Sequence, residues 1–147
     1  MSERASDPSE LMHPRLIAPG AALLIAALAT DVVYWRTLLA QWDNFSIWLI
    51  AAGLVLAGAA AFALVVDMAL GRIGPIAWGR FAGFALAALL SLLNAFVHSR
   101  DAYTAVVPNG LQLSALVAVI LLVLGWRGWS LQAVPRPYPS KPREARS

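Results

Sequence analysis

The chain has 147 residues, of which 60% are hydrophobic and only 13% are charged. About a quarter of the residues in soluble domains are charged, so this composition excludes an ordinary soluble protein and predicts a membrane protein. The lack of cysteine excludes disulfide bonds and thiolate chemistry. The net charge of +3 does not indicate a nucleic-acid partner, because the basic residues mark membrane topology and the tail.

Residues 1–15 form a polar segment before the first apolar stretch. Glu3, Asp7 and Glu10 make this segment too acidic for the basic start of a signal peptide, although the small residues around Ala27 resemble a cleavage site. We therefore expect the first apolar stretch to be retained as a helix and residues 1–15 to be a cytoplasmic N-terminal segment.

Four apolar stretches follow, at residues 16–34, 47–70, 81–97 and 111–129. Each is close to the ~20 residues that a helix needs to cross the ~30 Å hydrocarbon core. No alternating pattern indicates a barrel, and an open strand cannot satisfy its backbone in lipid, so the stretches predict helices. We expect an all-α fold, a polytopic bundle of four transmembrane helices in the lipid bilayer over residues 16–130.

The basic residues predict the orientation of this bundle. If the helices alternate in direction, nine of the 11 Lys and Arg residues lie on the side of the termini, and only Arg36 and Arg100 lie opposite. Such a bias marks the cytoplasmic side. We expect a bacterial inner-membrane protein with both termini cytoplasmic and with the loops near Asp43 and Asp101 facing outward.

The chain becomes basic and rich in proline after the fourth stretch. Pro135, Pro137, Pro139 and Pro142 lie among Lys and Arg residues. A segment of this composition cannot bury a core. Residues 131–147 are therefore expected to form a disordered cytoplasmic tail.

Small residues spaced four apart predict where the helices pack, since they let two backbones approach closely in lipid. The rows contain Ala18, Ala22 and Ala26 in the first stretch, Gly53 in the second, and Gly79, Gly83 and Ser91 in the third. We expect these rows to face the bundle interior. The spacing of Gly79 and Gly83 also leaves a homodimer open as an alternative.

Polar residues gather at the outer ends of the predicted helices. Asn94 and His98 share a face of the third helix, and the topology places His98 at the depth of Asp31 on the first. We expect a hydrogen bond between His98 and Asp31 that locks two helices together and contributes ~0.6–2 kcal/mol. Arg100 and Asp101 extend this outer polar cluster, either as a loop-closing ion pair or as a surface for a partner.

A second polar pair is predicted at the inner ends. His13 precedes Pro14 at the entry to the first helix, where a proline removes no backbone hydrogen bond. Asp67 ends the second helix on the same side. We therefore expect a contact between His13 and Asp67 that mirrors the outer pair and leaves a dry apolar middle.

No residue pattern indicates catalysis, a metal site or a cofactor. Ligation of haem by two histidines needs both imidazoles at equal depth, whereas the topology places His13 and His98 at opposite ends. The sequence contains no nucleophile paired with a base, no phosphate-binding loop and no spacing of ligands typical of a metal site. We therefore expect a protein without enzymatic activity.

The run from His98 to Pro108, with His13-Pro14, Asp31, Asp67 and the run from Gly125 to Trp129, resembles a bacterial family, the transmembrane domain of unknown function 2231. The resemblance implies a four-helix inner-membrane domain over about Met12 to Trp129, in a family without an established activity. Family members commonly continue with Val-Tyr-Arg-His, whereas this chain reads Leu-Gln-Ala-Val from residue 131. The departure implies that a cytoplasmic histidine partner for His13 is lost, or is supplied by another subunit.

Three functions fit these features. The first, which we favour, is a scaffold or modulator of a membrane complex, with a redox complex among the candidates. The second is ion-linked or proton-linked transport through Asp31, His98 and Asp67, although four short helices leave little room for a lumen. The third is a redox subunit whose haem or metal site is shared between chains.

Overall fold

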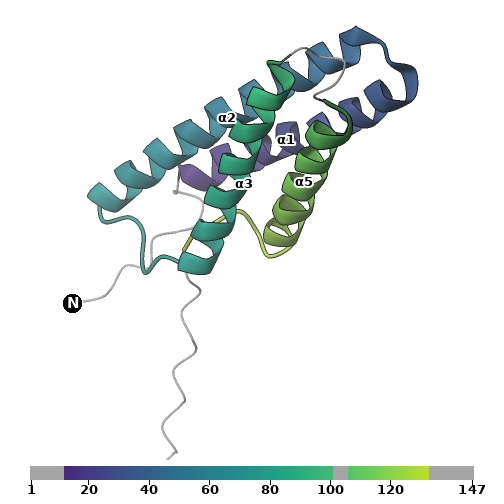
Figure 1. Cartoon of the computed structure of the whole chain (residues 1–147). Helices are drawn as coiled ribbons and strands as arrows, with labels where there is room; N and C mark the ends of the chain where they lie inside the picture. The colour runs from purple at the N-terminus through teal and green to yellow at the C-terminus, as the bar shows by residue number, and fades with distance from the viewer. Residues whose placement is uncertain (1–11, 101–105, 133–147) are drawn as a thin grey trace, which may run out of the picture.

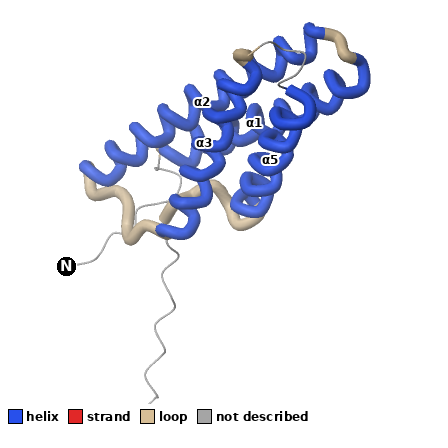
Figure 2. Tube along the Cα trace, viewed as in Figure 1, coloured by secondary structure: helices blue, strands red, loops and turns tan. Residues whose placement is uncertain are grey.

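The computed structural model describes residues 12–100 and 106–132. Its elements are four long helices and one π-helical turn that leads into the last of them (Figure 1). The helices are α1 (His13–Thr37), α2 (Ala40–Ala69), α3 (Trp78–His98) and α5 (Leu111–Gly125), and the π-helical turn is η2 (Val106–Gly110). Figure 2 shows that helices make up most of the described chain and that short loops connect them.

Four helical segments of the described chain are apolar and long enough to cross a membrane. The fourth spanning segment, Val107–Gly125, includes most of η2 as well as α5. The all-α fold with four spanning helices, predicted from the apolar stretches, is thus confirmed. The orientation with both termini cytoplasmic stays a prediction.

The first two helices form a long hairpin with a very tight turn. Leu38 adopts a left-handed conformation (φ 54°) and donates its backbone N–H to Tyr34 O at 2.7 Å, which ends α1. Only Leu39 separates it from the start of α2 at Ala40. Asp43, which was expected in an outer loop, therefore lies in the first turn of α2. The helix extends beyond the apolar stretch because a helical backbone satisfies its own hydrogen bonds whatever its side chains are.

The four helices close into a ring. The contact between α1 and α2 is the most extensive, and α3 and α5 lie side by side across this hairpin (Figure 1). In the ring, α1 packs against α2 and α5, and α3 packs against the same two helices. Each long helix therefore has two main neighbours and presents its remaining surface outward.

The closest approach in the hairpin involves two glycines, Gly20 on α1 and Gly53 on α2. A Cβ added to Gly53 would lie 2.7 Å from the Leu24 side chain and 3.2 Å from Gly20 O. Gly53 thus lies at the kind of contact that the sequence predicted. On α1 the expectation was wrong, because Ala22 is exposed and the buried row runs through Gly20, Leu24 and Ala27.

The third helix follows its predicted row only in part. Ser91 is buried, and a Cβ on Gly83 would lie 2.9 Å from Leu124 on α5. Gly79 differs from the expectation, because it is exposed and a Cβ there would have no neighbour within 4 Å. Gly79 therefore makes no close helix contact with any described residue.

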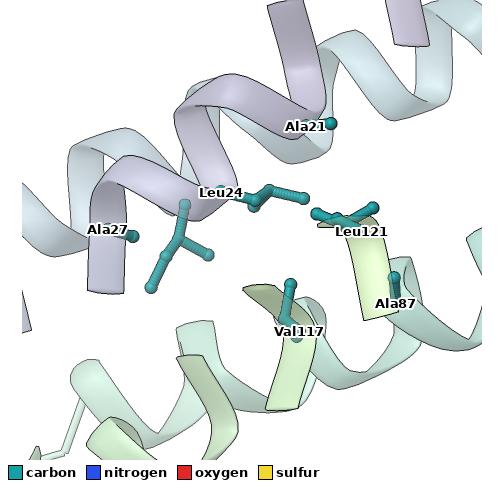
Figure 3. Close-up of a cluster of buried hydrophobic side chains, with 7 residues drawn as sticks. Ala21, Leu24, Ala27, Ala87, Val117 and Leu121 are labelled. Carbon is teal, nitrogen blue, oxygen red and sulfur yellow. The ribbon is translucent and has the colours of Figure 1, made fainter. Parts of the chain in front are cut away.

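The middle of the bundle is filled by small and aliphatic side chains. The buried cluster, drawn in Figure 3, contains Ala21, Leu24 and Ala27 on α1, Ile50 on α2, Ala87 on α3, and Val117 and Leu121 on α5. None of these side chains carries a polar atom. The centre of the bundle is therefore apolar.

The chain folds back onto the bundle after the fourth helix. That helix ends at Gly125 rather than at residue 129, and the Trp129 ring lies where a side chain on residue 125 would be. Leu131 is buried and accepts the backbone N–H of Ala77 at 2.9 Å. Leu131 and Gln132, which the sequence placed in the tail, thus contact this end of the bundle. The rest of the expected tail lies outside the described residues.

Candidate functional site

Asp31 on α1 is the centre of the outer polar cluster. Its carboxylate accepts the hydroxyl groups of Ser46 on α2 and Ser114 on α5. His98 Nε2 on α3 lies 3.0 Å from Asp31 Oδ1, and all four side chains are buried. One carboxylate thus joins all four long helices. The structure brings together the His98 and Asp31 side chains that the sequence had paired.

The hydrogen bonds of His98 define where its protons lie. Nδ1 lies 3.0 Å from the backbone carbonyl oxygen of Asn94, and Nε2 faces the Asp31 carboxylate. A carbonyl oxygen only accepts, so Nδ1 carries a hydrogen. Nε2 and Asp31 Oδ1 share a second hydrogen bond, so both ring nitrogens of His98 are engaged inside the bundle.

The outer cluster contains further polar groups. Asn94 donates from Nδ2 to Ser114 Oγ at 2.7 Å, so it reaches the carboxylate through a hydroxyl. Asp43 Oδ1 lies 3.9 Å from His98 Nε2 and has no hydrogen-bond partner among the described residues. The Asp43 side chain is 13% exposed, so this second carboxylate lies at the edge of the cluster.

The sequence had also placed Arg100 and Asp101 in this cluster. Arg100 is exposed, and only its backbone N–H is seen in a hydrogen bond, to Val97 O at 3.3 Å. Its side chain makes no ion pair within the described part of the chain. Asp101 lies outside the described residues. Arg100 is thus not a member of the buried cluster.

The inner cluster is built around Asp67 at the end of α2. Asp67 Oδ2 lies 2.8 Å from His13 Nδ1 and also accepts the backbone N–H groups of Met12 and His13, at 3.1 and 3.3 Å. Both side chains are fully buried. The first N–H groups of a helix lack partners within it, and no side chain of its own caps α1. Asp67 therefore caps α1 from a neighbouring helix, where the helix dipole also favours a negative charge.

His13 connects this cap to the end of the described chain. Its Nε2 accepts the backbone N–H of Leu131 at 3.3 Å. An accepting Nε2 carries no hydrogen, so the hydrogen lies on Nδ1 and the ring donates to Asp67. The inner cluster thus joins the start of α1, the end of α2 and residue 131. Asp67 Oδ1 is buried and has no hydrogen-bond partner among the described residues.

The two clusters lie far apart. Asp31 follows His13 by 18 positions along α1, which is about 27 Å at 1.5 Å per residue. The ring nitrogens of each histidine are all engaged, so neither ring offers a free lone pair to a metal. Within residues 12–100 and 106–132, no three His, Asp or Glu side chains are grouped in a way that could hold a metal ion.

Several members of these clusters could not be identified from the sequence. Ser46 and Ser114 look like the other small residues of apolar helices, and Asp43 fell outside the predicted second stretch. The backbone N–H of Leu131 has no signature in the sequence. The only available signal was indirect, because a buried carboxylate requires several donors and hydroxyl groups on facing helices can supply them.

Four apolar helices of spanning length, with buried polar clusters at both ends, define a small polytopic membrane protein. The family model DUF2231, described as a predicted membrane protein, matches residues 10–136. The chain therefore belongs to this family, as the resemblance had implied. No curated protein and no solved structure matches it.

Proposed function

We propose that the protein is a non-catalytic component of the bacterial inner membrane, with both termini in the cytoplasm, that scaffolds or modulates a membrane protein complex. The observation that carries this proposal is the closure of both His–Asp clusters. Each cluster ties helices together, and neither has a histidine nitrogen left for a ligand or a substrate. Such groups hold a bundle in one arrangement rather than carry out chemistry.

The middle of the bundle supports this role over proton transport. An apolar cavity of about 190 Å³ is lined by residues of all four long helices and by Leu131, and its walls include Leu24, Ala60 and Phe84. Glycine and apolar side chains form all of its lining, and cavities of this kind stay dry. A proton moving between the two clusters would therefore have to pass this cavity, whose lining holds no titratable side chain.

The outer surface is available for a partner. Large apolar side chains project from every long helix, including Val55 on α2 (71% exposed), Leu89 on α3 (59%) and Val119 on α5 (58%). These residues lie near the middle of their helices, where the surroundings are lipid or another membrane protein. A scaffold would bind through part of this surface and leave the rest to lipid.

Photo-crosslinking in the native membrane tests the proposal. Because the chain has no cysteine, Val55→Cys, Leu89→Cys and Val119→Cys each create a unique attachment point for a photoactivatable group. We expect one of these positions to give a discrete protein adduct in high yield and the other two to give mainly lipid adducts. Lipid adducts alone from all three positions would argue against a scaffold.

A flux measurement separates this function from transport. The purified protein in liposomes that contain a pH-sensitive dye should pass no more protons than empty liposomes under an imposed pH gradient and membrane potential. The Asp31→Asn variant should behave in the same way. A flux that the wild type shows and Asp31→Asn loses would instead establish the transport alternative.

A further inference from the structure

A groove of about 610 Å³ lies at the inner end of α5, and its lining combines positive charge with apolar surface. Arg80 from α3 and Arg127 from the turn after α5 supply the charge, and Leu122, Val123, Leu124 and Trp126 supply the rest of the wall. Leu122 and Val123 are 59% and 67% exposed, and they continue along α5 toward the middle of the membrane. The charged end and the apolar wall therefore follow one another along the helix axis.

The two arginines keep donors for a ligand. Arg80 donates from Nε to Ser130 O at 3.1 Å and from Nη2 to Leu124 O at 3.3 Å and Gly128 O, and its Nη1 has no partner in the described part of the chain. These carbonyls belong to the end of α5 and the loop that follows, so Arg80 also covers the negative end of that helix dipole. Arg127 is exposed and has no side-chain partner among the described residues.

The charge of this groove is not balanced within the described part of the chain. No carboxylate there forms an ion pair with Arg80 or Arg127. Trp126, which is 91% exposed, stands beside them as an indole ring does at the membrane interface. A phosphate group fits the arginine pair by charge and by its oxygen acceptors.

We propose that this groove binds an anionic phospholipid, with its phosphate at Arg80 and Arg127 and an acyl chain along Leu122 and Val123. The apolar wall selects a lipid over free phosphate, since a free ion would use only the arginine end. The net negative charge of the head group selects an anionic lipid over a zwitterionic one. The proposal does not depend on the scaffolding function, because it concerns only the bilayer around the chain.

Native mass spectrometry of the purified protein in a neutral detergent tests this site. Dioleoyl phosphatidylglycerol and dioleoyl phosphatidylcholine are added at equal concentration, so that the two lipids differ only in the head group. We expect the wild type to retain one phosphatidylglycerol in preference to phosphatidylcholine. Arg127→Gln should weaken that retention about tenfold, which is the loss expected for one charge-assisted contact.

Arg36→Gln is the matched control. Arg36 is exposed at the opposite end of the bundle, where its guanidinium lies 5.1 Å from the Trp35 ring, so the variant removes the same charge beside a similar tryptophan. Its retention of phosphatidylglycerol should equal that of the wild type. Equal losses in the two variants, or equal retention of the two lipids, would overturn the proposal. Displacement of the lipid by an equal concentration of inorganic phosphate would overturn it as well, because the groove would then recognise an anion without its acyl chain.

Discussion

Asp67, the last acidic residue of α2, caps the start of α1 at His13 and binds the ring of the same histidine. A single carboxylate oxygen, Oδ2, accepts both the backbone N–H and Nδ1–H of His13. The contact crosses 54 positions in the sequence and fixes the inner ends of two helices against each other. It does so without a second charged group, because Nε2 of the histidine accepts a hydrogen bond and the ring is neutral.

Replacement of this carboxylate should destabilise the bundle. Asp67→Asn keeps one acceptor oxygen but adds an amide whose hydrogens meet donors rather than acceptors, so we expect a loss of about 1–3 kcal/mol in the free energy of unfolding. Thermal denaturation in a mild detergent measures the change. Asp43→Asn is the control, since Asp43 Oδ1 has no hydrogen-bond partner in the described structure. A melting temperature that is equal in the two variants would contradict the capping role of Asp67.

The outer cluster should behave as a unit. Asp31→Asn disturbs three hydrogen bonds, so it should lower stability more than Ser114→Ala, which removes one of them. Individual hydrogen bonds in membranes contribute about 0.6 kcal/mol on average, and Asp31→Asn should exceed about 1.5 kcal/mol.

A double-mutant cycle tests the same relationship more directly. The effects of Asp31→Asn and His98→Gln should not add, because each variant breaks the contact between Nε2 and Oδ1. Unfolding measured in mixed micelles gives the coupling energy, which we expect to be at least about 0.5 kcal/mol. Additive effects would show that the two groups do not interact.

The hairpin contact gives a sharp test with two glycines of one helix. Gly53→Ala places a Cβ 2.7 Å from Leu24 and should cost about 1–3 kcal/mol through overpacking. Gly58→Ala meets no atom within 4 Å, and alanine is the better helix former by up to about 1 kcal/mol. The second variant should therefore be as stable as the wild type or slightly more stable. A comparison of melting temperatures checks both.

Cysteine labelling tests the predicted orientation. Leu38→Cys places a unique thiol in the exposed turn between α1 and α2, and Pro75→Cys places one in the exposed loop between α2 and α3. A membrane-impermeant maleimide added to cells with a permeabilised outer envelope and an intact inner membrane should label the first variant and not the second. The reverse pattern would place the termini outside.

The sequence predicted most of the fold and the central pair of each cluster, for a simple reason. Because the helices alternate in direction across a membrane, the position of a residue within its helix predicts its depth. His98 and Asp31 could therefore be paired from topology alone, as could His13 and Asp67. The serines that complete the outer cluster could not be predicted, because depth does not reveal which small residue faces a carboxylate.

The packing face of a helix could be predicted where a glycine marks it. It could not be predicted where two rows of small residues on the same helix are equally regular. Gly53 begins a row of small residues spaced four apart, with Ala57 and Ala61, and its partner helix approaches that row. On α1 the alanines around Ala22 form as regular a row as Gly20 and Leu24 do, and only the position of α2 decides between them. That position depends on contacts across the bundle, which a pattern within one helix does not contain.

The hydrogen bond between Leu131 and His13 uses the backbone N–H of residue 131. Substitutions and deletions near this residue should therefore affect the inner cluster differently. Any residue except proline offers the same N–H, so a substitution of Leu131 by another apolar residue leaves the inner cluster complete. A deletion of one residue between Gly125 and Leu131 would instead move a different N–H, at a different angle, to the ring. The inner cluster therefore depends on the number of residues between Gly125 and Leu131 and not on which apolar residue occupies position 131.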